Sequence, residues 1–482
     1  MKLSQVLAGL EPLSVHADGD LELGGVSYDS RTTRPGDLFV AVTGYAVDGH
    51  RFIHKAVENG AVAVLCERPP EEDIPYVTVS STRAALAQVG ANWFDHPAEK
   101  LTVVGVTGTN GKTTVTYLLK SVLEQCYGAK VGLIGTIQNM IGDEVIETER
   151  TTPESFELQG LFARMVEAGC SHAIMEVSSH ALVLHRVDCI PFAVGVFTNL
   201  TEDHLDFHKT MEEYGKAKAQ LFRRCKAGVL NHDDPAWETM TDGATCTIRT
   251  YTARGADAQV SATDLDLASD HVSFTVRSGG QCQAVTLGIP GGFTVYNALA
   301  VIGASLELGL SLPEIAAALT NAKGVKGRVE VVPTPGKPYT ILIDYAHTPD
   351  GLENVLRAVQ GFCKGRVIAV FGCGGDRDPI KRPIMGRIGV ELSDLAVITS
   401  DNPRTEDPMA IIDQIVAGFA GTEKPYVVIE NRREAIRWAM DHAEKDDIIV
   451  LCGKGHETYQ ILGTEKTHLD EREEVAAHLA GH

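Results

Sequence analysis

The stretch that most limits how this chain can fold is Val103-Val-Gly-Val-Thr-Gly-Thr-Asn-Gly-Lys-Thr-Thr114. A run of β-branched residues followed by glycines and Lys-Thr-Thr predicts a buried strand, then a loop, then a helix. Gly108 and Gly111 would let the loop turn its backbone N–H groups inward, and such groups bind phosphate oxygens. Lys112 adds a positive charge, and the hydroxyl of Thr113 is a suitable ligand for Mg²⁺. The stretch therefore predicts a binding loop for a nucleoside triphosphate.

The spacing of this loop is unusual. The general phosphate-loop pattern is G-x-x-x-x-G-K-[ST], and Val106 stands where its first glycine would be. The shorter form, Thr-Gly-Thr-Asn-Gly-Lys-Thr-Thr, points to one family of ligases. A tight turn with an incidental lysine is the alternative, but it requires the strand, both glycines and Lys-Thr to coincide. We expect the loop residues to contact ATP, namely Gly108, Thr109, Asn110, Gly111, Lys112, Thr113 and Thr114.

Composition narrows the class of protein. A chain of 482 residues is long enough for about three domains. Its 44% hydrophobic and 22% charged residues are typical of a soluble globular protein, and no apolar run reaches the ~20 residues of a membrane span. The net charge of −21 argues against nucleic acid as a partner, because phosphate backbones are held by broad basic surfaces. Ten scattered cysteines without a C-x-x-C pair indicate reduced thiols, and we expect a cytoplasmic protein.

Residues 1–98 read as a small α/β domain. Strands are predicted at Gly25–Tyr28, Asp37–Val42 and Ala61–Cys66, and helices at His50–Asn59 and Thr82–Phe94. Ser30 follows the first strand, where a polar side chain can meet a ligand. An Asx-type turn at Asp29 is the simpler interpretation of that motif on its own.

Residues 99–329 alternate between strand and helix patterns, which predicts βαβ units and a mostly parallel sheet. The predicted strands are Leu101–Val106, Ala173–Val177, Val194–Asn199 and Gly228–Asn231, and the predicted helices are Lys112–Gln125, Phe156–Ala168, Val295–Leu308 and Leu312–Ala322. Residues 255–290 alternate apolar and polar side chains, so an antiparallel appendage is expected there. Ligands of parallel sheets collect at the carboxyl ends of strands.

Polar residues stand at those strand ends. Glu176 closes an apolar strand, a poor place for a carboxylate unless a cation such as Mg²⁺ is near. His204, between Asp203 and Asp206, is a second candidate ligand; alternatively, Asp203 caps a helix and His204 is polar surface. Lys218 reads most simply as a solvated helix lysine. Its neutral amine could instead combine with CO₂, and the resulting carbamate would be an oxygen ligand.

A third α/β unit covers residues 330–482. Strands are predicted at Tyr339–Tyr345, Arg366–Phe371, Leu395–Thr399, Tyr426–Ile429 and Ile448–Cys452. Polar motifs again follow the strands: Asp344-Tyr-Ala-His347, Gly374-Gly-Asp-Arg-Asp378 with Lys381-Arg382, Asp401-Asn-Pro-Arg404, and Gly453-Lys-Gly-His-Glu457. Each motif alone can be an ordinary turn. Four in one domain favour a ligand-binding face.

The order of these motifs resembles that of the Mur ligases of peptidoglycan synthesis, and the match spans all three predicted domains. It is most similar to the branch that adds meso-2,6-diaminopimelate to UDP-N-acetylmuramoyl-L-alanyl-D-glutamate. The resemblance implies a UDP-muramoyl-substrate-binding domain at 1–98, a central ATP-binding P-loop domain at 99–329 and a Rossmann-like amino-acid-binding domain at 330–482. It also implies an acyl phosphate on the D-glutamate side chain that the incoming amine attacks. We expect a monomer.

The resemblance also implies residue roles. The catalytic centre would comprise Lys112, Glu176, His204 and Lys218, with Thr113, Glu176, His204 and carbamylated Lys218 as Mg²⁺ ligands. Further ATP contacts would be Asn297, Arg328, Asp344 and His347. The UDP-muramoyl substrate would meet Ser30, Thr151, Thr152, Ser178 and Arg186. Diaminopimelate would meet Arg377, Asp401, Asn402, Pro403, Arg404, Gly453 and Glu457.

Two positions depart from the family pattern, and rival functions stay open. Leu184 stands where the family has a glutamine, and Thr294 where an asparagine is common. The lysine-adding muramoyl ligases and the folylpolyglutamate synthases share the phosphate loop, and a regulatory P-loop ATPase is a further alternative. Arg404 favours diaminopimelate over lysine, because a guanidinium pairs bidentately with the carboxylate that lysine lacks.

Overall fold

The computed structural model describes residues 1–44, 47–148, 150–255 and 257–481. The chain forms two compact units, Met1–Thr250 with Gly303–Gly309, and Tyr251–Ile302 with Leu310–His482. The first unit contains two separate sheets, and the division of the chain into three domains stays a prediction.

The N-terminal sheet of the first unit has the strand order β1-β5-β4-β3-β2. Its strands are β1 (Ser14–His16), β2 (Gly25–Ser27), β3 (Asp37–Val40), β4 (Ala63–Cys66) and β5 (Tyr76–Thr78). The helices around it are α1 (Leu3–Val6), α2 (Ile53–Glu58) and α3 (Thr82–Trp93), with the 3₁₀ turns η1 (Gly49–Phe52) and η2 (Pro97–Lys100). The three predicted strands are present and pair in parallel, whereas β1 and β5 are three-residue strands without a clear alternating pattern.

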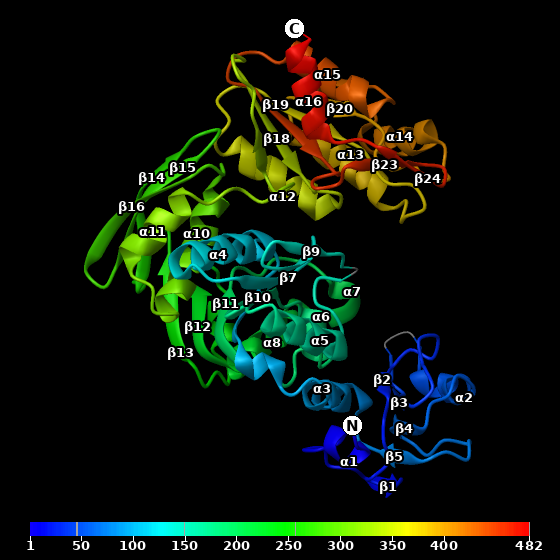
Figure 1. Cartoon of the computed structure of the whole chain (residues 1–482). Helices are drawn as coiled ribbons and strands as arrows, with labels where there is room; N and C mark the ends of the chain where they lie inside the picture. The colour runs from blue at the N-terminus through cyan, green and yellow to red at the C-terminus, as the bar shows by residue number, and fades with distance from the viewer. Residues whose placement is uncertain (45–46, 149, 256, 482) are drawn as a thin grey trace. The chain divides into compact units, whose positions relative to one another are not determined.

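The second sheet of the first unit is built around β6. The parallel strands are β6 (Thr102–Thr107), β7 (Val131–Ile134), β10 (His172–Glu176), β11 (Phe192–Phe197) and β12 (Cys225–Asn231), in the order β12-β11-β6-β10-β7. The short strands β8 (Asn139–Ile141) and β9 (Glu144–Ile146) extend it in antiparallel fashion. β11 and β12 lie side by side in Figure 1. The mostly parallel sheet that the sequence predicts is thereby confirmed.

Helices follow the strands of this sheet. They are α4 (Lys112–Tyr127), α5 (Ser155–Glu167), α6 (Ser179–Val183), α7 (Leu205–His208), α8 (Met211–Ala219) with the 3₁₀ turn η3 (Gln220–Arg223), and α9 (Trp237–Met240). Their apolar faces and the sheet form one core that includes Phe162, Met175 and Phe222.

The strand register brings three strand ends to the same edge of the sheet. Val106 of β6 lies opposite Glu176 of β10, and Thr107 lies opposite Phe197 of β11. Gly105 makes room for this packing, since a Cβ there would lie 2.8 Å from a ring carbon of Phe192. The segments after β6, β10 and β11 therefore start side by side.

The second unit begins with the expected antiparallel appendage. β14 (Val260–Leu267), β15 (Val272–Ser278) and β16 (Gln281–Leu287) form it, and β15 pairs with both β14 and β16 in antiparallel register. β13 (Thr247–Thr252) precedes them, and only its last two residues belong to this unit. The helices α10 (Gly292–Glu307) and α11 (Leu312–Thr320) follow in the sequence.

A six-stranded sheet forms the rest of the second unit, in the order β17-β18-β22-β19-β20-β21. Its strands are β17 (Glu330–Val332), β18 (Thr340–Asp344), β19 (Val367–Phe371), β20 (Leu395–Ile398), β21 (Tyr426–Val428) and β22 (Ile448–Cys452), all parallel except β17. The helices are α12 (Pro349–Gln360), α13 (Lys381–Glu391), α14 (Pro408–Val416) with the turn η4 (Ala417–Phe419), α15 (Arg432–His442) and α16 (Glu471–Ala480). A hairpin of β23 (Tyr459–Leu462) and β24 (Glu465–His468) precedes α16.

The structure also bears on disulfides and on membrane-spanning helices. None of the ten cysteines, all of which lie in the described ranges, forms a disulfide. In the part of the chain that the structure describes, no helix is both long and apolar enough to span a membrane.

Candidate functional site

The loop after β6 has the backbone that its glycines allow. Gly108 has a φ of 145°, and a Cβ there would lie 1.9 Å from Oγ1 of Thr198, so no other residue fits. Gly111 has a φ of 85° and precedes α4, whose first N–H groups receive no side-chain cap. Uncapped N–H groups at a helix N-terminus favour an anion. Lys112 lies across the loop, with Nζ donating to the carbonyls of Gly108 at 2.9 Å and Thr109 at 2.8 Å.

The segment that follows β11 fastens the loop. Asn110 N–H donates to Oδ1 of Asn199 at 2.9 Å, and Oγ1 of Thr198 donates to the Asn110 carbonyl at 2.7 Å. Oγ1 of Thr109 donates to the Thr201 carbonyl at 3.1 Å. The loop shape is thus held by side chains from the neighbouring strand end.

Glu176 is buried at the end of β10, with 1% of its surface exposed. Its Oε1 accepts from Oγ1 of Thr113 and from the backbone N–H of Thr136, both at 3.0 Å, and its Oε2 accepts from Oγ1 of Thr136 at 2.9 Å. Gly135 leaves room for the carboxylate, because a Cβ there would lie 2.6 Å from Oε1. The structure therefore brings Thr113 and Glu176 together.

Thr136 is a site residue that the sequence patterns did not single out. It follows β7, a four-residue strand whose Gly-containing sequence carries little strand signal. The available signal is its position just after a strand that neighbours β10.

The oxygen donors at Glu176 suit magnesium. Among the described residues, no group of three or more His, Cys, Asp or Glu side chains is placed to hold a metal. Mg²⁺ does not need such a cage, since it commonly uses one or two carboxylates, with waters and substrate phosphates completing its shell. The Glu176 carboxylate and the Thr113 hydroxyl are donors of that kind.

Lys218 on α8 is buried, with 1% of its surface exposed, so its interpretation as a solvated helix lysine is wrong. Its Nζ donates to the Gly108 carbonyl at 2.9 Å and lies 4.3 Å from the centre of the Tyr214 ring. Burial and the nearby charge of Lys112, which bonds the same carbonyl, lower the pKa of Lys218 well below its usual value. The amine is thereby biased toward its neutral form.

His204 lies in a cluster of rings. It has a φ of 54°, its Nε2 is 3.3 Å from Oδ2 of Asp203, and its ring centre is 4.9 Å from that of His180 and 6.2 Å from that of Tyr214. Asp203 accepts the His204 N–H at 2.8 Å, but no side chain caps the N-terminus of α7. The side chain of Asp206 lies outside the described residues. Metal binding by His204 stays a prediction.

Three of the residues predicted for the muramoyl substrate lie together. Oγ1 of Thr152 donates to the Glu176 carbonyl at 2.8 Å and accepts from the Ser178 N–H at 3.1 Å. Arg186 donates to the Thr152 carbonyl at 3.1 Å and pairs with Glu154 at 2.8 Å. Oγ1 of Thr151 lies 3.0 Å from that of Thr136.

The remaining residue of that set is Ser30, and Leu184 is a position that departs from the family pattern. Ser30 is buried in the N-terminal part of the unit, where its carbonyl accepts from Asn59 at 2.7 Å. Just before it, Oδ1 of Asp29 accepts the Arg31 N–H at 2.9 Å, which is the Asx-type turn considered from the sequence. Leu184 forms the C-cap of α6 and leaves Arg186 in place.

In the second unit, the Asp401–Arg404 turn presents Arg404. Arg404 has a φ of 52°, its N–H donates to the Ile461 carbonyl at 3.1 Å, and Nη1 donates to the Gly375 carbonyl at 2.8 Å. Gly375 cannot be larger, because a Cβ would lie 1.9 Å from the Pro403 carbonyl oxygen. Arg377 is exposed, with Nη1 3.3 Å from the Asp376 carbonyl oxygen.

Arg382 is a buried arginine that joins the loop after β19 to the loop after β20. Arg382 forms two hydrogen bonds with the Glu406 carboxylate, at 2.9 and 2.8 Å, and donates to the Gly374 carbonyl at 3.3 Å. This pairing lowers the pKa of Glu406 to about 2. Glu406 also accepts the Asp376 N–H, so the Arg382–Glu406 pair holds both loops.

The loop after β22 completes this face. Gly453 has a φ of 113°, and a Cβ there would lie 2.5 Å from Oδ2 of Asp401. Asn402 donates to Oε2 of Glu457 at 3.0 Å. The predicted residues Asp401, Asn402, Arg404, Gly453 and Glu457 therefore belong to one cluster of loops in this unit.

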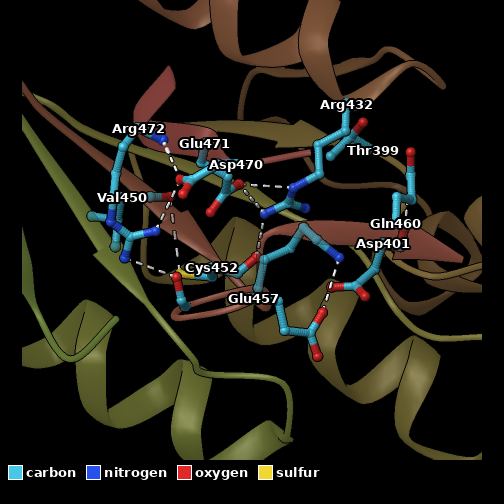
Figure 2. A network of polar contacts seen from close by, with 12 residues as sticks. Thr399, Asp401, Arg432, Val450, Cys452, Glu457, Gln460, Asp470, Glu471 and Arg472 are labelled. Atoms are coloured by element: carbon cyan, nitrogen blue, oxygen red, sulfur yellow. Dashed lines mark hydrogen bonds and ion pairs between the residues drawn. The ribbon is translucent and has the colours of Figure 1, made fainter. Parts of the chain in front are cut away.

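Helices α15 and α16 anchor that loop. Figure 2 shows Arg432 reaching toward Glu471 and Cys452. Both members of the Arg432–Glu471 pair are fully buried, 2.7 Å apart, and Arg432 donates to the Cys452 carbonyl at 2.8 Å. Arg472 donates to the Gly455 carbonyl at 3.0 Å and pairs with Glu330.

The residues predicted to complete the ATP contacts lie in the second unit. Asp344 is buried, which raises its pKa, and its oxygens accept the N–H groups of Val329 and Ala346, both at 2.9 Å. Tyr345 packs against His347, with ring centres 4.6 Å apart, and the Arg328 guanidinium lies 5.5 Å from the Tyr345 ring centre. Asn297 is buried on α10. Their contact with ATP stays a prediction.

Comparison with known proteins gives matches along nearly the whole chain. Three family models match: "Mur ligase family, catalytic domain" at residues 22–97, "Mur ligase middle domain" at 106–305, and "Mur ligase, glutamate ligase domain" at 327–455. A UDP-N-acetylmuramoyl-L-alanyl-D-glutamate–2,6-diaminopimelate ligase of Caldanaerobacter subterraneus subsp. tengcongensis is 48% identical, over 100% of this chain and 99% of its own. A protein of the same name, numbered 1, from Clostridium acetobutylicum is 49% identical, over 99% and 98%. A solved structure of a protein of that name has 30% identity and a TM-score of 0.75, over 100% and 99%.

The contacts of Glu176 predict how a substitution would behave. In Glu176→Gln the amide keeps one acceptor oxygen for the donors of Thr113 and Thr136 and loses the negative charge. We expect the variant to fold and the Mg²⁺-dependent part of nucleotide binding to weaken at least about tenfold. Calorimetric titration with a non-hydrolysable triphosphate, with and without Mg²⁺, measures this.

The matched control for that titration is Glu144→Gln. Glu144 lies on β9, is exposed, and pairs with Arg164. It should bind like wild type. An equal response of wild type and Glu176→Gln to Mg²⁺ would contradict the assignment of Glu176.

Proposed function

The chain belongs to the Mur ligase family, and from that premise we propose that it is an ATP-dependent ligase that adds meso-2,6-diaminopimelate to UDP-N-acetylmuramoyl-L-alanyl-D-glutamate. The reaction would belong to peptidoglycan precursor synthesis and would release ADP and phosphate. The observation that carries the choice of amino acid is the Asp401–Arg404 turn, where the Arg404 guanidinium donates from Nη1 to the Gly375 carbonyl. The other N–H groups of the guanidinium then suit a carboxylate.

The chemistry requires two anions to meet. The γ-phosphate of ATP would move to the D-glutamate side-chain carboxylate, ADP would leave, and the amine would then displace phosphate from the acyl carbon. Lys112 supplies a positive charge at the phosphate loop, where it would stabilise the transferring group. Bound Mg²⁺, held by the Thr113 hydroxyl and the Glu176 carboxylate, would reduce the repulsion between the two anions.

Lys218 supports a second part of the proposal, that its amine is carbamylated by CO₂. The neutral amine is the form that reacts with CO₂, and burial beside Lys112 favours that form. The carbamate would be a buried anion close to the phosphate loop, where the Lys112 ammonium and Mg²⁺ would offset its charge. We assign His204 to the same metal environment because His204 and Lys218 both contact the ring of Tyr214.

Selection of diaminopimelate over lysine rests on charge. The two amino acids differ by one carboxylate at the far end of the side chain, and Arg404 is the matched partner for it. Lysine would leave the guanidinium unpaired and place an ammonium near a cation, a penalty of roughly 2–5 kcal/mol in a desolvated site. Arg377, on the loop after β19, would hold the other carboxylate.

Composition supports a proposal for where the protein acts and which partners it lacks. We propose a cytoplasmic monomer that binds neither nucleic acid nor membrane, because the net charge of −21 repels polyanions and the substrates are small and water-soluble.

Phosphate release with each substrate omitted in turn tests the proposed function. We expect release only when ATP, the muramoyl dipeptide and diaminopimelate are all present, since the amine must consume the acyl phosphate. Release with nucleotide alone would indicate a regulatory P-loop ATPase instead. Release that requires L-lysine or a folate in place of these substrates would identify one of the related ligases.

Carbamylation predicts a specific pattern of loss and rescue. Lys218→Ala should lose ligation by orders of magnitude, and a small carboxylic acid such as acetate should restore part of it by filling the place of the carbamate. Lys216→Ala, on the same helix but exposed, should remain active. The measurement is ligation rate against acetate concentration, with a ¹³CO₂ carbamate signal in wild type. A bare ammonium in the active wild-type enzyme would contradict the proposal.

Arg404→Ala tests the choice of amino acid. We expect kcat/KM for diaminopimelate to fall on the order of 30-fold or more, because a desolvated charge pair is worth roughly 2–5 kcal/mol, and the preference for diaminopimelate over L-lysine to shrink. Arg357→Ala removes an exposed arginine paired with Glu353 and serves as the control. Wild type that uses L-lysine as well as diaminopimelate would overturn this assignment.

A further inference from the structure

A lysine ammonium is buried in the loop that follows β22. The side chain of Lys454 is 0% exposed, and its Nζ donates to Oδ1 of Asn402 and to Oε2 of Glu457, both at 3.0 Å. A buried charge requires partners of this kind, since its loss of hydration is otherwise uncompensated. Lys454 therefore joins the loop after β20 to the loop after β22.

The hydrogen bonds fix which way the Asn402 amide points. Its Oδ1 accepts from Lys454 Nζ and also from the Ile461 N–H at 3.0 Å, so the amide oxygen must face these two donors. Its Nδ2 is then the group that donates to Oε2 of Glu457, at 3.0 Å. Without the Lys454 ammonium, Oδ1 of Asn402 would keep only the Ile461 N–H as a donor to hold this orientation.

The same contacts divide the roles of the two Glu457 oxygens. Oε2 accepts from both Asn402 and Lys454, whereas Oε1 accepts from no donor in the ranges that the structure describes. The Glu457 side chain is 12% exposed. One oxygen is thus committed to the protein, and the other is the one that can meet a ligand.

We propose that Lys454 is a positioning residue for the amino-acid substrate: together with Asn402 it fixes Glu457 so that Oε1 receives an ammonium of the incoming diaminopimelate. This inference rests on the proposed function and adds to it a residue that does not itself touch substrate. It also gives Asn402 a role in orienting Glu457.

Two effects of Lys454 have opposite signs. As a cation it repels a substrate ammonium, so its charge alone would weaken binding, and its removal would lower KM. As a positioning residue it holds the carboxylate in place, and its removal would raise KM. The sign of the change in KM separates these two effects.

The test compares Lys454→Met with Lys466→Met in the full-length enzyme. Both lysines lie over the Tyr459 ring, with Nζ 5.7 and 3.7 Å from its centre, but Lys466 is on the exposed hairpin strand β24. We expect Lys454→Met to raise KM for diaminopimelate about tenfold or more, as the loss of a charged hydrogen bond implies. KM for ATP and the muramoyl dipeptide should stay within about twofold, and Lys466→Met should match wild type.

A double-mutant cycle with Glu457→Gln separates positioning from general destabilisation. If Lys454 acts through Glu457, the double variant should have the KM of Glu457→Gln alone, whereas a purely structural role gives effects that multiply. Lys454→Gln, which keeps an N–H donor, replaces Lys454→Met should the latter not fold. An unchanged or lowered KM for diaminopimelate, or multiplying effects, would overturn the inference. A wild type that does not use diaminopimelate at all would instead refute the proposed function.

Discussion

A buried carboxylate needs a donor for each oxygen, and in the first unit Glu176 obtains its donors from segments that follow different strands. Thr113 comes from the helix after β6 and Thr136 from the segment after β7, while Glu176 itself ends β10. These segments meet only because the parallel register sets Val106 beside Glu176 and β7 along the other side of β10. A one-residue slip of β10 would point the carboxylate to the opposite face of the sheet. The phosphate loop and its candidate metal ligands thus depend on sheet register.

In the second unit, the candidate site is positioned by contacts between loops rather than by the register of its strands. Arg382 is fixed by Glu406, and the backbones of Gly375 and Pro403 approach so closely that no side chain fits between them. Buried ion pairs such as Arg432–Glu471 are weak evidence for stability, because desolvation offsets their attraction. Here Arg432 also holds the Cys452 carbonyl, which fixes where the loop after β22 begins. The clearest effect of the Arg432–Glu471 pair is therefore to fix the position of that loop.

The sequence predicted most strands of both parallel sheets, though not β7, because buried parallel strands are continuous apolar runs, as in Val367–Phe371. It also placed polar motifs at their carboxyl ends, which the register of β6 and β10 explains. It did not predict contacts that depend on tertiary packing. Thr136 follows a strand too short to give a pattern, and Lys218 lies in a polar helical stretch that carries no sign of burial. The structural roles of Arg382 and Lys454 depend on partners more than twenty residues away.

The net charge of −21 raises the question of how such a chain attracts anionic substrates. Long-range attraction is not the answer, since a negative protein repels anions and salt screens charges beyond about 10 Å. The first unit instead concentrates cations over short distances: Lys112 and Lys218 donate to the same carbonyl, and Arg83, Arg150 and Arg186 surround Glu154. Two ammonium groups on one carbonyl repel each other, and that repulsion is relieved when an anion arrives or when one amine becomes a carbamate. The same local arrangement thus favours phosphate binding and disfavours the charged form of Lys218.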